Sequence, residues 1–190
     1  MPKIVRRHDA RADVLLLIDV INPFDFKGSG PIVRAATRAA PKIEALAERA
    51  RARKIPVVYV NDNFGRWRSD FESIFEACTA PDQPGHAVAA RLRPHPGDYF
   101  VLKPRHSGFY STPLDLLLTH LKARTLAIAG FAANLCVAFT ANDAYMLGYH
   151  VVAPSDCTGA NSPVLTRDTL KHIRVALRGT VVPSPRVQFR

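Results

Sequence analysis

The chain has 190 residues, of which 47% are hydrophobic and 22% charged, and this composition indicates a globular rather than a disordered protein. We expect a single domain over residues 1–190, with short arms at about 1–12 and 184–190. No apolar stretch approaches the ~20 residues that cross a bilayer, and the first residues lack the apolar core of a secretory signal. We therefore expect a cytoplasmic protein with no membrane partner.

The net charge of +10 arises from 26 Lys and Arg residues against 16 Asp and Glu residues. Such a charge can indicate nucleic-acid binding. The basic residues are scattered, however, and no aromatic-interleaved basic stripe or nucleic-acid motif accompanies them. We do not expect nucleic acid as the main partner, although a non-catalytic basic binding protein remains an alternative. A basic surface that attracts anionic substrates is another interpretation.

Strand-like and helix-like segments alternate along the chain. Residues 13–19 form an apolar run closed by a charge, which is typical of a parallel strand buried on both faces. The pattern then predicts a helix over 34–54 with Pro41 near an early turn or kink, a strand over 55–61, helices over 69–78 and 84–92, and a strand over 99–103.

The second half continues the alternation. Thr112 is predicted as the N-cap of a helix with Pro113 at its first position. The remaining segments are a strand over 125–130, a helix over 135–147 ended by Gly148, a strand over 149–154, a helix over 162–177 and a short strand over 180–182. This order predicts an α/β fold, with three α/β/α layers around a mostly parallel six-stranded sheet of Rossmann-like type.

Chemically active residues follow the strand-like runs, where ligands bind in such sheets. Asp19 ends the first run and Lys103 the third, while Cys136 lies in the turn between the fourth run and the next helix. A thiol near a helix start tends to ionise, which favours a nucleophile. Each residue also has a structural interpretation: a buried packing cysteine, a turn aspartate and a solvated lysine.

The other two cysteines carry less information. Cys78 and Cys157 are interpreted as packing residues, and three cysteines without a CxxC motif argue against a disulfide framework or a cysteine zinc site.

Three segments carry a resemblance to a known family. They are residues 16–25 (LLIDVINPFD), 101–112 (VLKPRHSGFYST) and 130–137 (GFAANLCV), together with Ala144 and Gly148. Over roughly residues 13–183 the sequence resembles the isochorismatase-like cysteine hydrolases, which include nicotinamidases and N-carbamoylsarcosine amidases. The resemblance implies the isochorismatase-like fold and a homo-oligomer.

The resemblance also implies a catalytic triad of Asp19, Lys103 and Cys136. Cys136 would attack a carbonyl carbon and form a thioester, Asp19 would act as the general base, and Lys103 would supply positive charge. The family places a cis peptide before its cysteine, here Phe131–Ala132, and an oxyanion hole at the backbone N–H groups of Ala132 and Cys136. Ala133 stands where the family often has Thr, so one hydroxyl is missing.

The nicotinamidase branch of the family holds a metal through an Asp-x-His pair and a further His. Here Phe64 stands two places after Asp62, so we expect neither a metal nor another cofactor. For substrate binding we name Phe24, Asn61, Trp67 and Phe109, whose alternatives are core packing, subunit contact or, for Asn61, loop capping. His106 offers a Cys-His dyad, which we rank below Asp19.

The sequence thus predicts a metal-independent hydrolase that cleaves a C–N bond in a small amide or carbamoyl compound through Cys136. The alternative within the family is vinyl-ether hydrolysis of the isochorismatase type, which does not need the thiol. A thiol redox sensor is a further alternative, for which a partner cysteine nearby in the sequence is missing.

Overall fold

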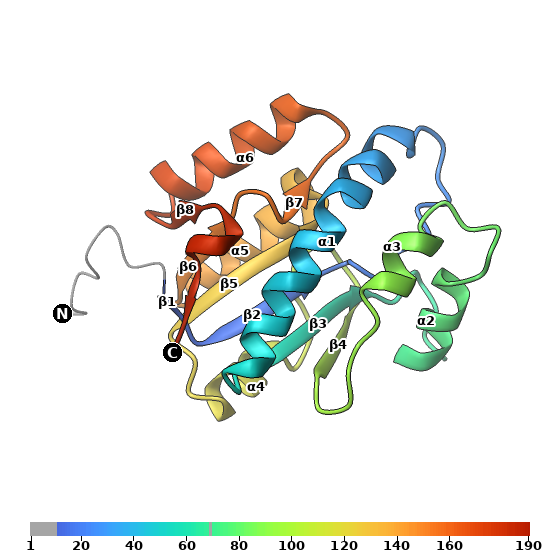
Figure 1. Ribbon diagram of the computed structural model, residues 1–190. Helices are drawn as coiled ribbons and strands as arrows, with labels where there is room; N and C mark the ends of the chain where they lie inside the picture. The colour runs from blue at the N-terminus through green and yellow to red at the C-terminus, as the bar shows by residue number, and fades with distance from the viewer. Residues whose placement is uncertain (1–10, 69) are drawn as a thin grey trace.

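The computed structural model describes residues 11–68 and 70–190 (Figure 1). Its sheet has the strand order β4-β3-β2-β5-β6-β8, with the short β7 paired to β5, and the registered pairs of these strands are all parallel. The strands are β2 (Val14–Ile18), β3 (Val57–Asp62), β4 (Tyr99–Lys103), β5 (Thr125–Phe131), β6 (His150–Pro154), β7 (Thr158–Gly159) and β8 (Thr180–Val182). The predicted parallel α/β sheet is confirmed.

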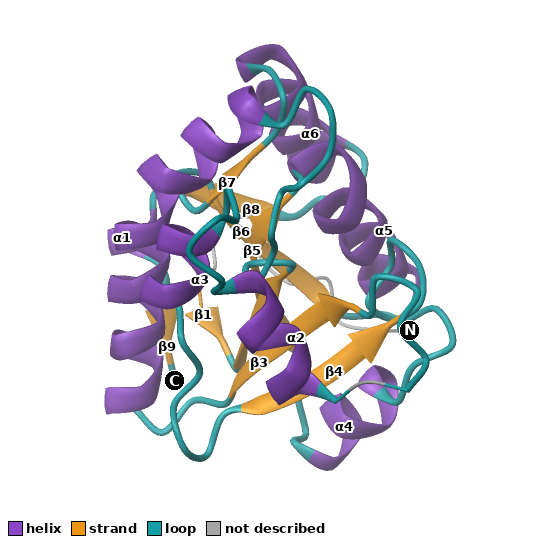
Figure 2. Cartoon of the chain, turned by 90° about the vertical axis from the view of Figure 1, so that its right-hand side faces the viewer, coloured by secondary structure: helices purple, strands orange, loops and turns teal. Residues whose placement is uncertain are grey.

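Helices cover both faces of the sheet (Figure 2). Alternate side chains of β2 explain this, because Leu15 and Leu17 enter one core cluster whereas Leu16 and Ile18 enter the other. The first cluster includes side chains from α1 (Gly30–Ala52), α2 (Phe71–Cys78) and α3 (His86–Arg91), and the second from α4 (Leu114–His120), α5 (Ala138–Met146) and α6 (Pro163–Val175). The three-layer prediction is therefore correct. Across the described ranges, no helix is both long and apolar enough to span a membrane.

Several helix boundaries differ from the prediction. Helix α1 begins at Gly30 rather than 34 and continues through Pro41, since its buried stripe runs without a break from Ile32 to Ala50. The segment predicted as one helix over 135–147 divides into a π-helical turn, η1 (Ala133–Val137), and α5. The N-cap of α4 is Pro113, and the Thr112 hydroxyl accepts a hydrogen bond from the Leu114 N–H at 3.2 Å.

Of the two predicted terminal arms, the structure describes the C-terminal one and only residues 11–12 of the N-terminal one. Residues 1–10 of the expected N-terminal arm lie outside the described residues, as does position 69 at the predicted start of the helix over 69–78. At the other end, η2 (Ser184–Arg186) leads into β9 (Gln188–Phe189), which pairs with β1 (Arg11–Ala12). Val187 and Phe189 are buried in the core, so residues 184–190 pack against the body of the protein.

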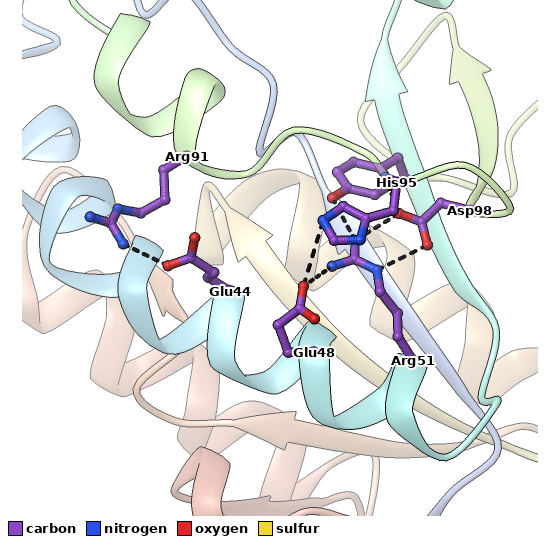
Figure 3. A network of polar contacts seen from close by, with 7 residues as sticks. Glu44, Glu48, Arg51, Arg91, His95 and Asp98 are labelled. Atoms are coloured by element: carbon purple, nitrogen blue, oxygen red, sulfur yellow. Dashed lines mark hydrogen bonds and ion pairs between the residues drawn. The ribbon is translucent and has the colours of Figure 1, made fainter.

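A polar network ties the C-terminal half of α1 to the segment that precedes β4 (Figure 3). The guanidinium of Arg51 donates two hydrogen bonds to Asp98, at 3.2 Å and 2.6 Å, and contacts Glu48 at 2.6 Å. Arg91 pairs with Glu44 at 2.6 Å on the neighbouring turn. The Asp98 side chain is only 5% exposed, so the bidentate pair holds the start of β4 against α1.

We predict that Arg51→Met lowers the free energy of unfolding by about 2–3 kcal/mol, because Asp98 loses its cation while it stays buried. Urea unfolding measures the change. Arg53→Met, at the exposed C-cap of the same helix, is the matched control and should shift stability by less than about 0.5 kcal/mol. Equal effects of the two substitutions would contradict the role of the pair.

Candidate active site

Asp19 follows β2 directly and turns its carboxylate into the protein. Its φ of 47° lies in the left-handed region, which Asp tolerates better than most residues. The backbone N–H of Asp62 donates to one carboxylate oxygen at 2.7 Å, and Lys103 Nζ lies 2.9 Å from the other. Asp19 is only 3% exposed, so the Asp62 N–H and the Lys103 ammonium take the place of water as hydrogen-bond donors to its carboxylate.

Lys103 ends β4 and is completely buried. Its ammonium lies 2.9 Å from Asp19, 3.5 Å from the Asp62 carboxylate and 3.6 Å from the Cys136 sulfur. Burial by itself lowers the pKa of Lys103, but Asp19, Cys136 and Asp62 together raise it above its ordinary value. The side chain is therefore an ammonium held in the interior by acids.

Cys136 is the fourth residue of η1, and the close approach of β5 to β2 positions this turn. Gly130 makes that approach possible, because a Cβ on it would lie 2.0 Å from the Ile18 carbonyl oxygen, and its φ of 119° suits glycine. The peptide bond Phe131–Ala132 is cis. The Ala132 carbonyl then accepts from the N–H groups of Leu135 and Val137, which closes the turn around the sulfur.

The resting sulfur is a thiol. Burial is the main cause that raises the pKa of Cys136, the charge of Asp19 raises it further, and Lys103 opposes both. Burial also raises the pKa of Asp19 above 3.8, against the lowering effect of Lys103. The thiolate expected from a helix start is thus not the ground state, because Cys136 lies inside the turn and 9% exposed, next to a carboxylate.

Lys103 holds the Cys136 thiol and the Asp19 carboxylate at one place. The ammonium of Lys103 lies 3.6 Å from the Cys136 sulfur and 2.9 Å from the Asp19 carboxylate, and the charge of Asp19 raises the pKa of the thiol. Burial raises the pKa of Asp19, which makes it a better proton acceptor than an ordinary aspartate. The arrangement can deprotonate the sulfur when an electrophile reaches it. The fold therefore gathers the three residues of the predicted triad at one end of the sheet, where Lys103 contacts both Asp19 and Cys136.

His106 reaches the same sulfur from the exposed side. Its Nδ1 lies 3.7 Å from Sγ, and its ring packs on Phe139 with centroids 5.5 Å apart. The following residues fix this loop, since Ser107 donates to Asp143 at 2.5 Å and the Gly108 N–H donates to Thr140 at 3.0 Å. Both Asp19 and His106 thus flank Cys136, the first in the interior and the second at the surface.

Asp62 is a site residue to which the sequence analysis gave no role. It bonds Asp19 through its backbone and faces Lys103 through its side chain. The available signal was the run Asn61-Asp62-Asn63 at the end of a buried strand, which the β3–β4 register places opposite Lys103. Within the described ranges, no group of three or more His, Cys, Asp or Glu side chains is placed to hold a metal ion.

The four predicted substrate-binding residues are placed differently from one another. Phe24 is 1% exposed and packs edge-on against Phe131, with centroids 6.2 Å apart, while Phe109 stacks on Tyr149 at 6.0 Å. Asn61 is buried and donates to the Ile21 carbonyl. Its Oδ1 has no hydrogen-bond partner among the described residues.

Trp67, by contrast, is 79% exposed on the loop after β3. The positions of Phe24 and Phe109 are therefore explained by packing within the chain. Such packing does not explain Trp67 or the side-chain oxygen of Asn61, and these two groups could still contact a substrate. The remaining strand-end amide, Asn63, accepts from the Gly65 N–H at 2.9 Å and so caps its own loop.

A family model described as Isochorismatase domain matches residues 13–184. The chain belongs to the isochorismatase family. The resemblance drawn from the sequence is thereby confirmed, and with it the prediction of a hydrolase. The match spans every element from β2 to β8 and therefore includes Asp19, Lys103 and Cys136.

The chain is similar in sequence to several named proteins, at different levels of identity. The chain is 40% identical over 154 residues to the uncharacterized isochorismatase family protein YaaI of Bacillus subtilis, covering 80% of this chain and 84% of that protein. It is 30% identical over 201 residues to the ureidoacrylate amidohydrolase RutB of Methylorubrum extorquens, with 87% and 77% covered. The crystal structure of N-carbamoylsarcosine amidase from Thermoplasma acidophilum superposes with a TM-score of 0.70 at 26% identity, covering 90% of this chain and 95% of that one.

We predict that Cys136 ionises above its ordinary pKa of 9.0 in the free protein, and that Asp19→Asn lowers this pKa because the ammonium of Lys103 then acts without the opposing carboxylate. The ultraviolet absorbance of thiolate, followed against pH, measures both. Cys136→Ser supplies the baseline, since Cys78 and Cys157 remain in every variant. A thiolate signal from Cys136 at neutral pH in the unmodified protein would refute the assignment.

Proposed function

We propose that this chain is a cysteine hydrolase that cleaves a C–N bond of a small amide or carbamoyl compound through a thioester on Cys136. One observation carries the proposal: the thiol, the Asp19 carboxylate and the buried Lys103 ammonium meet at the carboxyl edge of the sheet, with Lys103 Nζ 2.9 Å from Asp19 and 3.6 Å from the sulfur. The amidohydrolases among the relatives support amide hydrolysis in general.

The reaction runs in two halves. As the Cys136 sulfur bonds to the carbonyl carbon, Asp19 takes the thiol proton, and it passes this proton to the leaving nitrogen when the C–N bond breaks. Water then attacks the thioester, Asp19 takes a proton from the water, and the sulfur leaves and is reprotonated. Lys103 keeps its charge throughout and balances the negative charge that moves between oxygen and sulfur.

The backbone N–H groups of Ala132 and Cys136 are the proposed oxyanion donors. The Ala132 N–H belongs to the cis peptide itself at the N-cap of η1, and the Cys136 N–H lies within η1. Donors of this kind typically contribute about 2.7–4 kcal/mol each to transition-state stabilisation. Since Ala133 has no hydroxyl, backbone donors carry this role without side-chain help.

The names of two relatives narrow the substrate class. Ureidoacrylate and N-carbamoylsarcosine both carry an N-carbamoyl group on a small carboxylic acid, and proteins named for their cleavage match this chain over most of its length. Ureido and carbamoyl acids are therefore the first compounds to screen, before simple amides. The site needs no metal or other cofactor for this chemistry, and the homo-oligomer implied by the resemblance stays a prediction.

We predict that Cys136→Ala lowers kcat for a ureido acid by roughly 10⁴-fold or more while the fold is retained, because no other group can form the thioester. Rapid quenching and intact-mass measurement should find an acyl adduct on the unmodified protein and none on the variant. Turnover by Cys136→Ala would overturn the mechanism. Hydrolysis of a vinyl ether by that variant would favour the isochorismatase-type alternative.

We predict that Asp19→Asn lowers kcat/KM by about 10²–10⁴-fold, as for loss of a general base. In the unmodified protein the acid limb of the kcat/KM profile should lie above pH 3.8, because burial raises the pKa of Asp19 and protonation removes the base as the pH falls. The limb should disappear in Asp19→Asn. An unchanged limb in the variant would assign the titration to another group, and His106→Gln then identifies it.

A further inference from the structure

A cavity lies between α1 and α6, and Cys136 is not among its lining residues. Its volume is about 1000 Å³, at the upper end for small-molecule sites. The short strand β7 lies between the two helices (Figure 1), and Ser155, Thr158 and Asn161 supply polar groups to the lining. None of the proposed catalytic residues lines this space.

Cations line both long walls of the cavity. Helix α1 contributes Arg34, Arg38 and Lys42, which are spaced four residues apart and therefore share one face over about 12 Å. Helix α6 contributes Arg167, Lys171 and Arg174 at a similar helical spacing. Two basic stripes thus face the same space.

Few acids offset these charges. Among the described residues that line the cavity, Asp156 is the one with an acidic side chain. Its carboxylate already accepts hydrogen bonds from the backbone N–H and the hydroxyl of Ser184, at 2.7 Å and 3.1 Å. Arg34, Arg38, Lys42 and Lys171 form no ion pair with an acid in the described ranges, whereas Arg167 pairs with its neighbour Asp168.

Without a bound anion, the two basic stripes destabilise the protein by repelling each other. Like charges four residues apart on a helix cost about 0.2–0.5 kcal/mol per pair, and the facing stripe adds repulsion across the cavity. Elsewhere on α1 the chain avoids this cost, because Glu44 and Glu48 pair with Arg91 and Arg51. A multiply charged anion would remove the repulsion between the stripes.

We propose that this cavity binds a small molecule with several phosphate groups, of the nucleoside triphosphate class. Arg and Lys are the usual phosphate partners, and six of them along two walls match several phosphates rather than one. The lining also includes apolar side chains, among them Ala35, Ala39, Leu170 and Val181, which suit an organic body next to the phosphates. The site is distinct from the hydrolytic one.

The lining disfavours two other occupants. It contains no aromatic side chain on which successive bases of a single-stranded nucleic acid could stack. If a second copy of the chain docked through the same face, two equally basic surfaces would meet and repel each other. A compact, free phosphate ester avoids both problems.

The proposal is tested by calorimetry on the full chain at low salt, with ATP, inorganic triphosphate, orthophosphate and a short single-stranded RNA as probes. ATP and triphosphate should bind more tightly than orthophosphate, and their affinity should fall as salt rises. The double variant Arg38→Gln/Lys171→Gln should weaken ATP binding by roughly tenfold or more, since two charge-assisted contacts are lost. No turnover is needed, so the result is independent of the proposed hydrolysis.

The matched control is Lys122→Gln/Arg124→Gln, which removes the same charge from exposed positions before β5. It should keep the affinity of the unmodified protein. Without ligand, Arg38→Gln/Lys171→Gln should melt no lower than the unmodified protein, because repulsion is relieved, and this excludes misfolding as the cause of lost binding. Equal losses in both double variants, no binding of ATP or triphosphate, or tighter binding of RNA than of ATP would each overturn the proposal.

Discussion

The contact between Lys103 and Asp19 is the interaction on which the site depends. Both groups are buried, and transfer of each charge out of water costs several kcal/mol unless a partner compensates for it. They lie on β4 and after β2, two strands that β3 separates in the sheet, so the pair joins the ends of non-adjacent strands. Asp62, at the end of β3, bridges them through its N–H and its carboxylate. The carboxyl edge of three strands thus folds as one charged unit.

This unit sets the chemistry of the sulfur. A buried ammonium between two acids does not give up its proton easily, so it contributes a constant positive charge. The proposed mechanism therefore assigns proton transfer to Asp19. Burial and the Asp19 carboxylate raise the pKa of the Cys136 thiol and so favour its protonated form. In the proposed mechanism, the thiol reacts when a carbonyl carbon reaches the sulfur and Asp19 accepts its proton. Under this mechanism, the same burial that costs folding energy also controls when the Cys136 thiolate forms.

The sequence predicted the sheet and its strand ends because continuous apolar runs and terminal charges are local signals. The strand-end positions of Asp19, Lys103 and Cys136 could be predicted in this way, and the resemblance of three motifs led to the prediction that they act together. Features that depend on how neighbouring strands pack together could not be predicted from such local signals. The role of Asp62 follows from register, and the protonated state of Cys136 follows from burial among charges of both signs. The aromatic residues show the same limit, since a loop position does not reveal that Phe24 packs on Phe131 whereas Trp67 faces solvent.

The overall charge illustrates the remaining gap between sequence and structure. Along the chain the basic residues look scattered, because Arg34, Arg38 and Lys42 are far from Arg167, Lys171 and Arg174 in sequence. Helical periodicity gathers each set on one face, and the fold brings the two faces to one cavity. At the other end of α1, acids interrupt the basic residues and form the network that fixes β4. Helix α1 thus has two groups of charged residues. The paired ones fix the start of β4, the strand that carries Lys103 of the proposed triad, and the unpaired ones face the cavity of the proposed anion.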